Sequence, residues 1–207
     1  YTIGDYLSED IRTGEISTDA PEFVTAEEEI RVRLAKFIYN KGKNSVDYYH
    51  KKLGKIMWNQ CGMSRNEKEL KQAMDSIKSL RKDFYENVKV PGKLDGFNEE
   101  LAKAGRVADF LELGELFAKD ALERTESCGG HFREESQTPE GEALRDDEYF
   151  NFVSAWKYNG EPSDAELVKE MLGNNFTDSS VPLPAIAQTI GTSGTYRTTA
   201  KTTTAVY

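Results

Sequence analysis

The chain has 207 residues, of which 38% are hydrophobic, 30% charged and 11% aromatic, a composition that excludes collagen-like, mucin-like and wholly disordered chains. The 27 Lys and Arg against 36 Asp and Glu give a net charge of -9, and no basic patch offsets it, so we expect no binding to nucleic acid. No apolar run approaches the roughly 20 residues of a membrane helix, so no direct membrane insertion is expected.

The first 24 residues are interpreted as the end of an upstream element and a linker. Ile3, Tyr6 and Leu7 would share one face of a short N-terminal helix over residues 1–11, and residues 17–21 have the composition of a loop. Residue 1 is Tyr rather than Met, and no charged leader precedes an apolar stretch. We therefore expect a chain that begins within a longer protein and lacks a secretory signal.

Residues 25–60 predict two helices. Thr25 and Glu28 have the spacing of a capping box, in which each side chain bonds a free backbone N–H at the helix start. The apolar stripe that follows is Ile30, Leu34 and Ile38. A second helix is expected from about Ser45 to Gln60, with the stripe Tyr49, Leu53, Ile56 and Met57, and with Gly62 ending it.

Two further helices complete a predicted bundle over residues 25–127. Ser64 and Glu67 suggest a second capping box, followed by the apolar positions Leu70, Met74, Ile77, Leu80, Phe84 and Val88. The last helix is expected from near Asp95, with a possible interruption at Gly105. Its apolar stripe is Val107, Phe110, Leu111, Gly114, Phe117, Ala121 and Leu122. The fold class is thus mainly α, an antiparallel three-helix bundle with a short N-terminal helix, followed by a loop and at least one β-strand.

After Glu126 the pattern changes. Residues 128–160 predict a glycine loop and then a strand, since Phe150, Phe152, Trp156 and Tyr158 alternate with smaller or polar residues. We expect the rest of its sheet to lie outside the chain. Residues 161–207 are interpreted as a divergent tail, with a short helix over 164–172 and disorder from residue 174, where Ser, Thr, Gly and Ala dominate.

Few residues suggest a catalytic or metal-binding role. The spacing of His50, Cys61, Cys128 and His131 matches no zinc motif. A Cys128–His131 nucleophile pair would need a third group to orient it. The carboxylates Glu134, Glu135, Asp146 and Asp147 are typical of solvated loops. We therefore expect no catalytic, cofactor-binding or metal residue in this chain. The segment that stands out is the signature loop, residues 126–134, where Gly129 and Gly130 permit close backbone approach and His131 and Arg133 would face one side. Buried against a partner domain, Arg133 would require carboxylate or carbonyl acceptors.

This segment resembles a known family. The run Thr125-Glu126-Ser127-Cys128-Gly129-Gly130-His131-Phe132-Arg133, preceded by a helical bundle and followed by Asp146-Asp147-Glu148-Tyr149 and Trp156, is similar to the C-terminal region of the flavoprotein subunit of fumarate reductase/succinate dehydrogenase. Many members have Arg-Gly-Ala where this chain has Cys128-Gly129-Gly130. The resemblance covers about residues 1–160, and from about residue 161 the chain departs from the basic, strand-forming end that members usually carry.

The resemblance implies FAD-dependent interconversion of fumarate and succinate by an upstream flavin domain, with hydride passing between the substrate and flavin N5 and an arginine acting as proton donor and acceptor. FAD, usually attached to a histidine, would belong to the full-length subunit and not to this fragment. The implied partners are the upstream flavin domain, an iron–sulfur subunit and a membrane anchor subunit, at the cytoplasmic face of the bacterial cell membrane.

No catalytic residue of the family is carried over to this chain. Glu126, Ser127, Gly129, His131 and Arg133 match the signature and are predicted to lie at an interface with the flavin domain. Two alternatives stay open: a stand-alone helical interaction module, and the C-terminal domain of L-aspartate oxidase.

Overall fold

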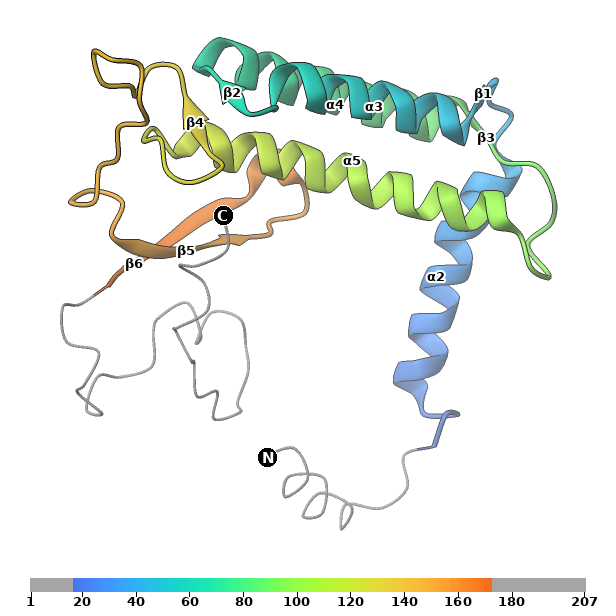
Figure 1. Ribbon diagram of the computed structural model, residues 1–207. Coiled ribbons are helices and arrows are strands. Elements are labelled where there is room, and N and C mark those ends of the chain that lie inside the picture. The colour runs from blue at the N-terminus through green and yellow to red at the C-terminus, as the bar shows by residue number, and fades with distance from the viewer. Residues whose placement is uncertain (1–16, 173–207) are drawn as a thin grey trace.

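The computed structural model describes residues 17–172 (Figure 1). Its helices are α2 (Pro21–Tyr39), α3 (Val46–Gln60), α4 (Glu67–Asn87), α5 (Glu99–Glu123) and the short 3-10 helix η2 (Pro162–Asp164). Its strands are β1 (Asn44–Ser45), β2 (Ser64–Arg65), β3 (Val88–Lys89), β4 (Phe132–Arg133), β5 (Phe152–Lys157) and β6 (Glu166–Met171). The predicted mainly helical class is confirmed, whereas the helix expected over residues 1–11 and the tail from residue 174 lie outside the described residues.

Helices α3, α4 and α5 run side by side and form the bundle (Figure 1). Short connections reverse the chain between them, so α3 and α5 run parallel to each other and antiparallel to α4. Two-residue parallel pairs, β1 with β3 and β2 with β4, lie at the helix ends. Within the described part of the chain, no helix has both the length and the apolar character needed to span a bilayer.

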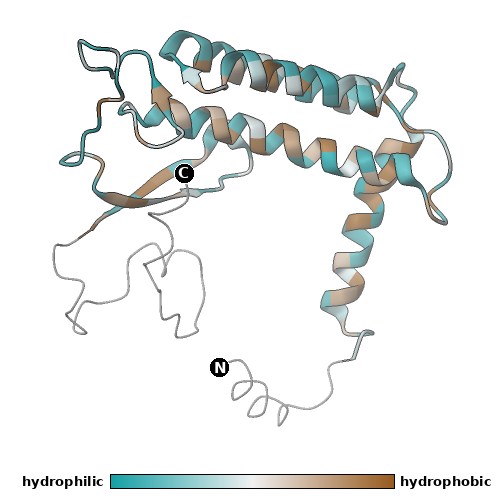
Figure 2. Ribbon diagram, in the orientation of Figure 1, coloured by the Kyte–Doolittle hydropathy of each residue, from teal (hydrophilic) through white to brown (hydrophobic). Residues whose placement is uncertain are grey.

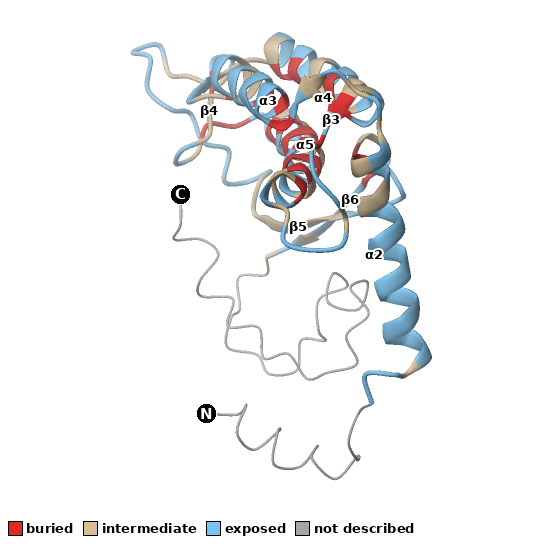
Figure 3. Ribbon diagram, turned by 90° about the vertical axis from the view of Figure 1, so that its right-hand side faces the viewer, coloured by how far each residue is buried: buried red, intermediate tan, exposed pale blue. Residues whose placement is uncertain are grey.

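The core follows the predicted stripes of α3 and α4. Tyr49, Leu53, Leu70, Ile77 and Phe84 are all buried. Figure 3 shows that the buried positions face the centre of the bundle. Tyr49 packs edge-on to Phe84, with ring centroids 5.2 Å apart, and its hydroxyl donates to the Asp83 carboxylate at 3.0 Å. Burial of the ring raises the pKa of Tyr49 to about 12.

Helix α2 leaves the end of the bundle and projects from it (Figure 1). Only its last turns reach the core, where Phe37 is buried and Leu34 and Ile38 are partly buried. The predicted stripe therefore holds at Leu34 and Ile38 but not at Ile30, which is exposed. Figure 2 shows hydrophobic residues along the projecting part as well.

Three helix starts differ from the sequence predictions. Helix α2 begins at Pro21 rather than Thr25, because proline needs no N–H partner in the first turn and its fixed φ suits a helix start. Helix α4 begins after Asn66, whose side chain accepts from the Glu69 N–H at 2.9 Å, so the proposed Ser64–Glu67 box is wrong. Helix α5 begins after Asn98, which caps the Leu101 N–H, and it continues unbroken through Gly105.

The largest error concerns the C-terminal sheet. Residues 166–171 form β6, which pairs antiparallel with β5, so the predicted helix over 164–172 and the predicted absence of a partner strand are both wrong. Leu167 and Val168 fit a helix as well as a strand by spacing alone. Pairing of Ala155 with Val168 and of Trp156 with Leu167 decides between the two, since cross-strand packing overrides local preference.

The β5–β6 hairpin is held under α5 by polar contacts. Lys119 of α5 donates to the carbonyls of Ser163 at 2.9 Å and Ala165 at 2.6 Å. Trp156 of β5 donates from its indole nitrogen to Asp120 at 2.7 Å. Arg81 of α4 contacts both the buried Glu115 at 3.2 Å and Glu161 at 2.5 Å. These contacts attach the hairpin to the bundle with little apolar burial.

The connection between α2 and β1 has a strict steric requirement at Gly42. A Cβ at this position would lie 2.1 Å from the Asn87 carbonyl oxygen. We expect Gly42→Ala to lower the free energy of unfolding by about 1–3 kcal/mol, because backbone must shift to admit the methyl group. Gly54→Ala is the matched control, since nothing lies within 4 Å of its Cβ and alanine favours a helix interior. Denaturant unfolding of both variants measures the difference, and equal stabilities would contradict the packing at Gly42.

Candidate functional site

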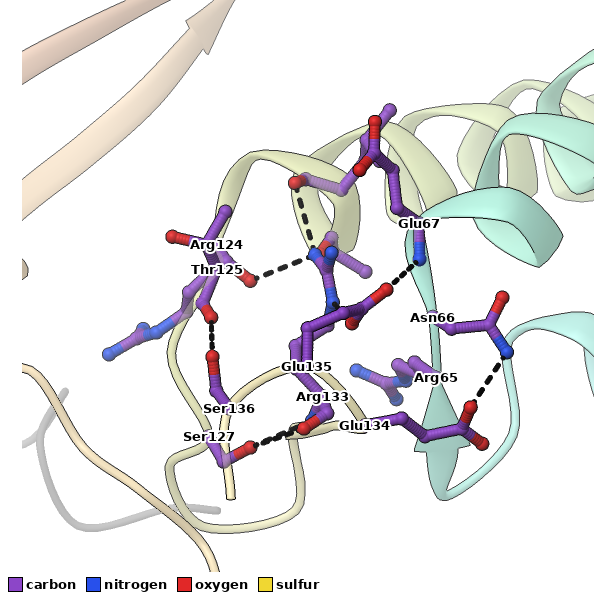
Figure 4. Close-up of polar contacts among 12 residues, drawn as sticks. Arg65, Asn66, Glu67, Arg124, Thr125, Ser127, Arg133, Glu134, Glu135 and Ser136 are labelled. Carbon is purple, nitrogen blue, oxygen red and sulfur yellow. Dashed lines mark hydrogen bonds and ion pairs between the residues drawn. The ribbon is translucent and has the colours of Figure 1, made fainter. Parts of the chain in front are cut away.

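The signature loop crosses the end of the bundle where α5 ends and α4 begins (Figure 4). Strand β4 pairs in parallel with β2, with Arg133 opposite Arg65 and Phe132 opposite Ser64. The Glu134 N–H continues this pairing by donating to the Arg65 carbonyl at 2.8 Å. The loop therefore joins the α3–α4 connection to the C-terminus of α5.

Arg133 is the buried centre of the loop, with 3% of the residue exposed. Its guanidinium NH1 lies 3.0 Å from the Ala121 carbonyl, 3.1 Å from that of Leu122 and 3.3 Å from that of Arg124. The last carbonyls of a helix have no partner inside the helix and carry partial negative charge. Arg133 thus caps α5 with a cation, and its carbonyl acceptors belong to its own chain rather than to a partner domain.

Two further buried polar residues fix the loop. The Ser127 hydroxyl accepts from the Arg133 N–H at 2.8 Å and donates to the Arg133 carbonyl at 3.1 Å. Glu126 accepts from Arg124 Nε at 2.9 Å and from the Asp146 N–H at 2.8 Å. Each buried donor and acceptor finds its partner within the chain, which the burial of these groups requires.

His131 uses both ring nitrogens. Arg65 NH1 donates to Nδ1 and Nε2 donates to the Arg124 carbonyl, both at 2.7 Å. A guanidinium only donates and a carbonyl only accepts, so the ring is neutral with its hydrogen on Nε2. Burial lowers the pKa of His131, and the charges of Arg65, Arg133 and Arg124 lower it further. His131 and Arg133 do face one side, as predicted, and both reach the Arg124 carbonyl.

Glu134 and Glu135 are exposed, as expected of solvated residues, and each also bonds the start of α4. Glu134 accepts from the Ser64 hydroxyl at 2.7 Å and from the Asn66 amide at 3.0 Å. Glu135 accepts from the Glu67 N–H at 2.6 Å and pairs with Arg133 at 3.1 Å. Partial burial acts to raise the pKa of Glu135, but the Glu67 N–H and Arg133 lower it overall. The Arg133–Glu135 pair therefore joins the C-terminus of one helix to the N-terminus of another.

Gly129 and Gly130 form the exposed tip of the loop. Reciprocal backbone bonds join Cys128 and His131, and Gly129 has φ +58°, the conformation at the first central position of a type II′ hairpin turn. A Cβ on Gly130 would meet nothing within 4 Å. Sequence reasoning missed Arg65, Asn66 and Arg124, because their partners are distant in sequence and no spacing links them.

The other candidate groups do not assemble into a reactive centre. Both nitrogens of His131 are occupied, so it has no lone pair for a metal or for the Cys128 thiol. Cys61 is buried, which raises the pKa of its thiol to about 11. Among residues 17–172, no three His, Cys, Asp or Glu side chains cluster as metal ligands would. The polar groups of the loop bond within the chain.

We expect Arg133→Met to lower the free energy of unfolding by about 2–4 kcal/mol, because it leaves the α5 carbonyls and the buried Ser127 region without their cation. Arg145→Met is the matched control, since Arg145 is exposed and pairs only with the exposed Asp147. Its effect should stay within about 0.5 kcal/mol. Urea unfolding measures both, and equal effects of the two substitutions would refute the capping role.

His131 should make stability depend on pH. Its pKa in the folded chain lies below the ordinary value of 6.5, so the folded state favours the neutral ring. This contribution is complete above pH 6.5 and is lost as the pH falls below it, because the unfolded chain takes up the proton first. We expect His131→Gln to flatten the loss of stability between about pH 7.5 and 5. Urea unfolding midpoints across this pH range measure how stability depends on pH. A slope of stability against pH that is unchanged in His131→Gln would contradict the prediction.

Comparison with known proteins identifies the family of this arrangement. Residues 50–183, more than half of the chain, match the family model described as fumarate reductase flavoprotein C-term. The match continues past residue 160, where we expected the resemblance to end, and it includes the β5–β6 hairpin.

Relatives and solved structures agree with this match. An uncharacterized FAD-dependent oxidoreductase of Methanocaldococcus jannaschii is 32% identical over 112 residues, 54% of this chain and 20% of that protein. The fumarate reductase flavoprotein subunit of Helicobacter pylori is 28% identical over 131 residues, 63% of this chain and 18% of that protein.

Among solved structures, the Mycobacterium smegmatis Sdh1 complex aligns with a TM-score of 0.56 at 26% identity, covering 78% of this chain and 26% of the other. A quinol-fumarate reductase aligns with a TM-score of 0.63 at 22% identity, covering 86% of this chain and 29% of the other, which supports the fold. The chain spans about a fifth of the length of these curated relatives. By its sequence match and its fold, the chain belongs to the fumarate reductase flavoprotein C-terminal family.

Proposed function

We propose that this chain is the C-terminal helical region of a flavoprotein subunit that interconverts fumarate and succinate. The observation that carries the proposal is the family match over residues 50–183, together with a signature loop whose polar side chains bond within the chain. FAD bound upstream would supply the hydride chemistry. The residues described here would supply a rigid support, since none of the signature side chains is free to act on a substrate.

The signature loop gives this support a defined end. Arg133 and Glu135 hold the ends of α5 and α4 together, and Ser127 and Glu126 hold the loop on them. The Gly129–Gly130 turn then presents backbone without side chains. We propose that this tip contacts the flavin domain, where glycine permits an approach that a side chain would prevent. In this proposal the interface depends on four residues that hold the tip in position: Glu126, Ser127, His131 and Arg133.

The proposed partners follow from the relatives. Several solved structures with this fold are named as quinol fumarate reductases or succinate dehydrogenase complexes. By analogy, an iron–sulfur subunit and a membrane anchor subunit would complete the assembly, on the cytoplasmic side of the bacterial membrane. FAD would be bound by the full-length subunit and not by this region.

A stand-alone helical module remains the second candidate, and one observation favours it. The β5–β6 pairing gives β5 a partner strand within the chain, as a self-sufficient module would require. Nothing specific in the structure favours an L-aspartate oxidase over the proposed subunit.

The proposal is tested by comparing the 207-residue chain with the full-length subunit purified from the source cell. We expect flavin absorbance and fumarate-dependent oxidation of a reduced dye in the full-length subunit, and neither in the chain alone. A natural protein that begins near Tyr1, or redox-active flavin in the 207-residue chain, would overturn the proposal.

A substitution at the tip of the signature loop tests the proposed interface. Gly130→Val should leave the stability of the 207-residue chain within about 0.5 kcal/mol, because space around its Cβ is open. In the full-length subunit, the same substitution should lower flavin retention or activity several-fold, because the side chain would separate the two domains. Gly105→Val lies away from the tip, also places its Cβ in open space, and serves as the control. Full activity in Gly130→Val would contradict the contact.

A further inference from the structure

An apolar groove lies open between the two parallel helices of the bundle, and we name it the α3–α5 groove. Its walls are His50, Gly54 and Met57 of α3 and Phe110, Leu113 and Phe117 of α5, and its volume is about 300 Å³. The sequence predicted that Phe110 and Phe117 would join the core. Instead, Phe110 is 44% exposed, Phe117 45% and Leu113 60%.

The groove has the form of a site for a helix. Phe110, Leu113 and Phe117 follow one another at i, i+3 and i+7 and form one row along α5, and the groove runs parallel to both helices. His50 stacks on Phe110 at 6.1 Å and the Arg65 guanidinium lies 5.1 Å from the Phe117 ring, so each end of the row is held by a side chain from α3 or β2. Such grooves accept the apolar face of an amphipathic helix.

The α3 side of the groove is basic. Residues 48–66 contain Lys51, Lys52, Lys55 and Arg65 and no Asp or Glu, within a chain whose net charge is -9. By helical geometry, Lys51 and the 83% exposed Trp58 lie on the lip beside Gly54. An occupant that buries apolar side chains in the groove would gain from acidic residues facing this lip.

We propose that the occupant is an acid-flanked amphipathic helix from the upstream part of the same flavoprotein subunit, which packs its apolar face into the α3–α5 groove. This inference rests on the proposed function, because the relatives are about three times as long as this chain. The volume of the groove is at the low end of the range found for ligand pockets. A segment of the same chain is held at high effective concentration and can cover it. A second copy is a poorer occupant, because two chains of net charge -9 repel each other.

The test measures protection of Leu113 by thiol labelling. Leu113→Cys is made in the 207-residue chain and in the full-length subunit, and maleimide labelling is followed by peptide mass spectrometry, which separates the introduced thiol from Cys61 and Cys128. Ser79→Cys on the exposed face of α4 is the matched control. We expect labelling at position 113 to slow at least about tenfold in the full-length subunit and labelling at position 79 to change less than about twofold.

Filling the groove gives a second, independent measurement. Gly54→Leu places a side chain in open space within the groove, whereas Gly105→Leu places one in open space of α5 outside it. In the full-length subunit, Gly54→Leu should restore fast labelling at position 113 and Gly105→Leu should not.

Equal labelling at position 113 in both proteins would overturn the inference. Protection that is already present in the 207-residue chain, or that appears only when the iron–sulfur subunit is added, would also overturn it, because the occupant would then be another segment. Fumarate reduction by the same preparation separates the two proposals. If the subunit is active but position 113 is unprotected, this inference alone is contradicted. If the natural protein contains no flavin, the proposed function is contradicted.

Discussion

The end of the bundle depends on one buried cation. Arg133 lies where the last carbonyls of α5 have no partner inside the helix, and its guanidinium bonds the carbonyls of Ala121 and Leu122. Burying such a charge is costly unless carbonyls and carboxylates surround it, and here Glu135 completes the set. The same Glu135 caps α4, so a single ion pair fixes two helix ends and the loop between them. The signature loop is therefore a structural joint.

The sequence predicted the elements that local chemistry determines. Helix α3 begins after Ser45 as expected, because its side chain caps the Tyr48 N–H, and the α4 stripe is buried as its 3.6-residue spacing requires. Contacts between residues far apart in the sequence determine the features that were not predicted. Strand β6 exists because it pairs with β5, and α2 exposes Ile30 because it leaves the bundle. At the site, the sequence predicts that a buried Arg133 needs carbonyl or carboxylate acceptors. It does not predict which carbonyls accept, or that Arg65 and Arg124 take part, because those contacts depend on the fold.

The signature loop and the α3–α5 groove are different kinds of surface. At the signature loop, the buried polar side chains are satisfied internally and the Gly129–Gly130 backbone is exposed at the tip. At the α3–α5 groove, aromatic and aliphatic side chains remain half exposed beside a row of lysines. A helical region that supports a larger flavoprotein needs both, because a rigid joint sets its shape and an apolar face provides the free energy of docking.

The most direct test of this account is the turnover of the full-length subunit carrying Arg133→Met, measured per bound flavin beside its thermal unfolding. A structural joint predicts a melting temperature lowered by several degrees with kcat per bound flavin and KM for fumarate nearly unchanged, since Arg133 bonds the carbonyls at the end of α5 and the Glu135 carboxylate. A subunit of undiminished stability that loses kcat would show that Arg133 acts in the reaction, and it would contradict the account.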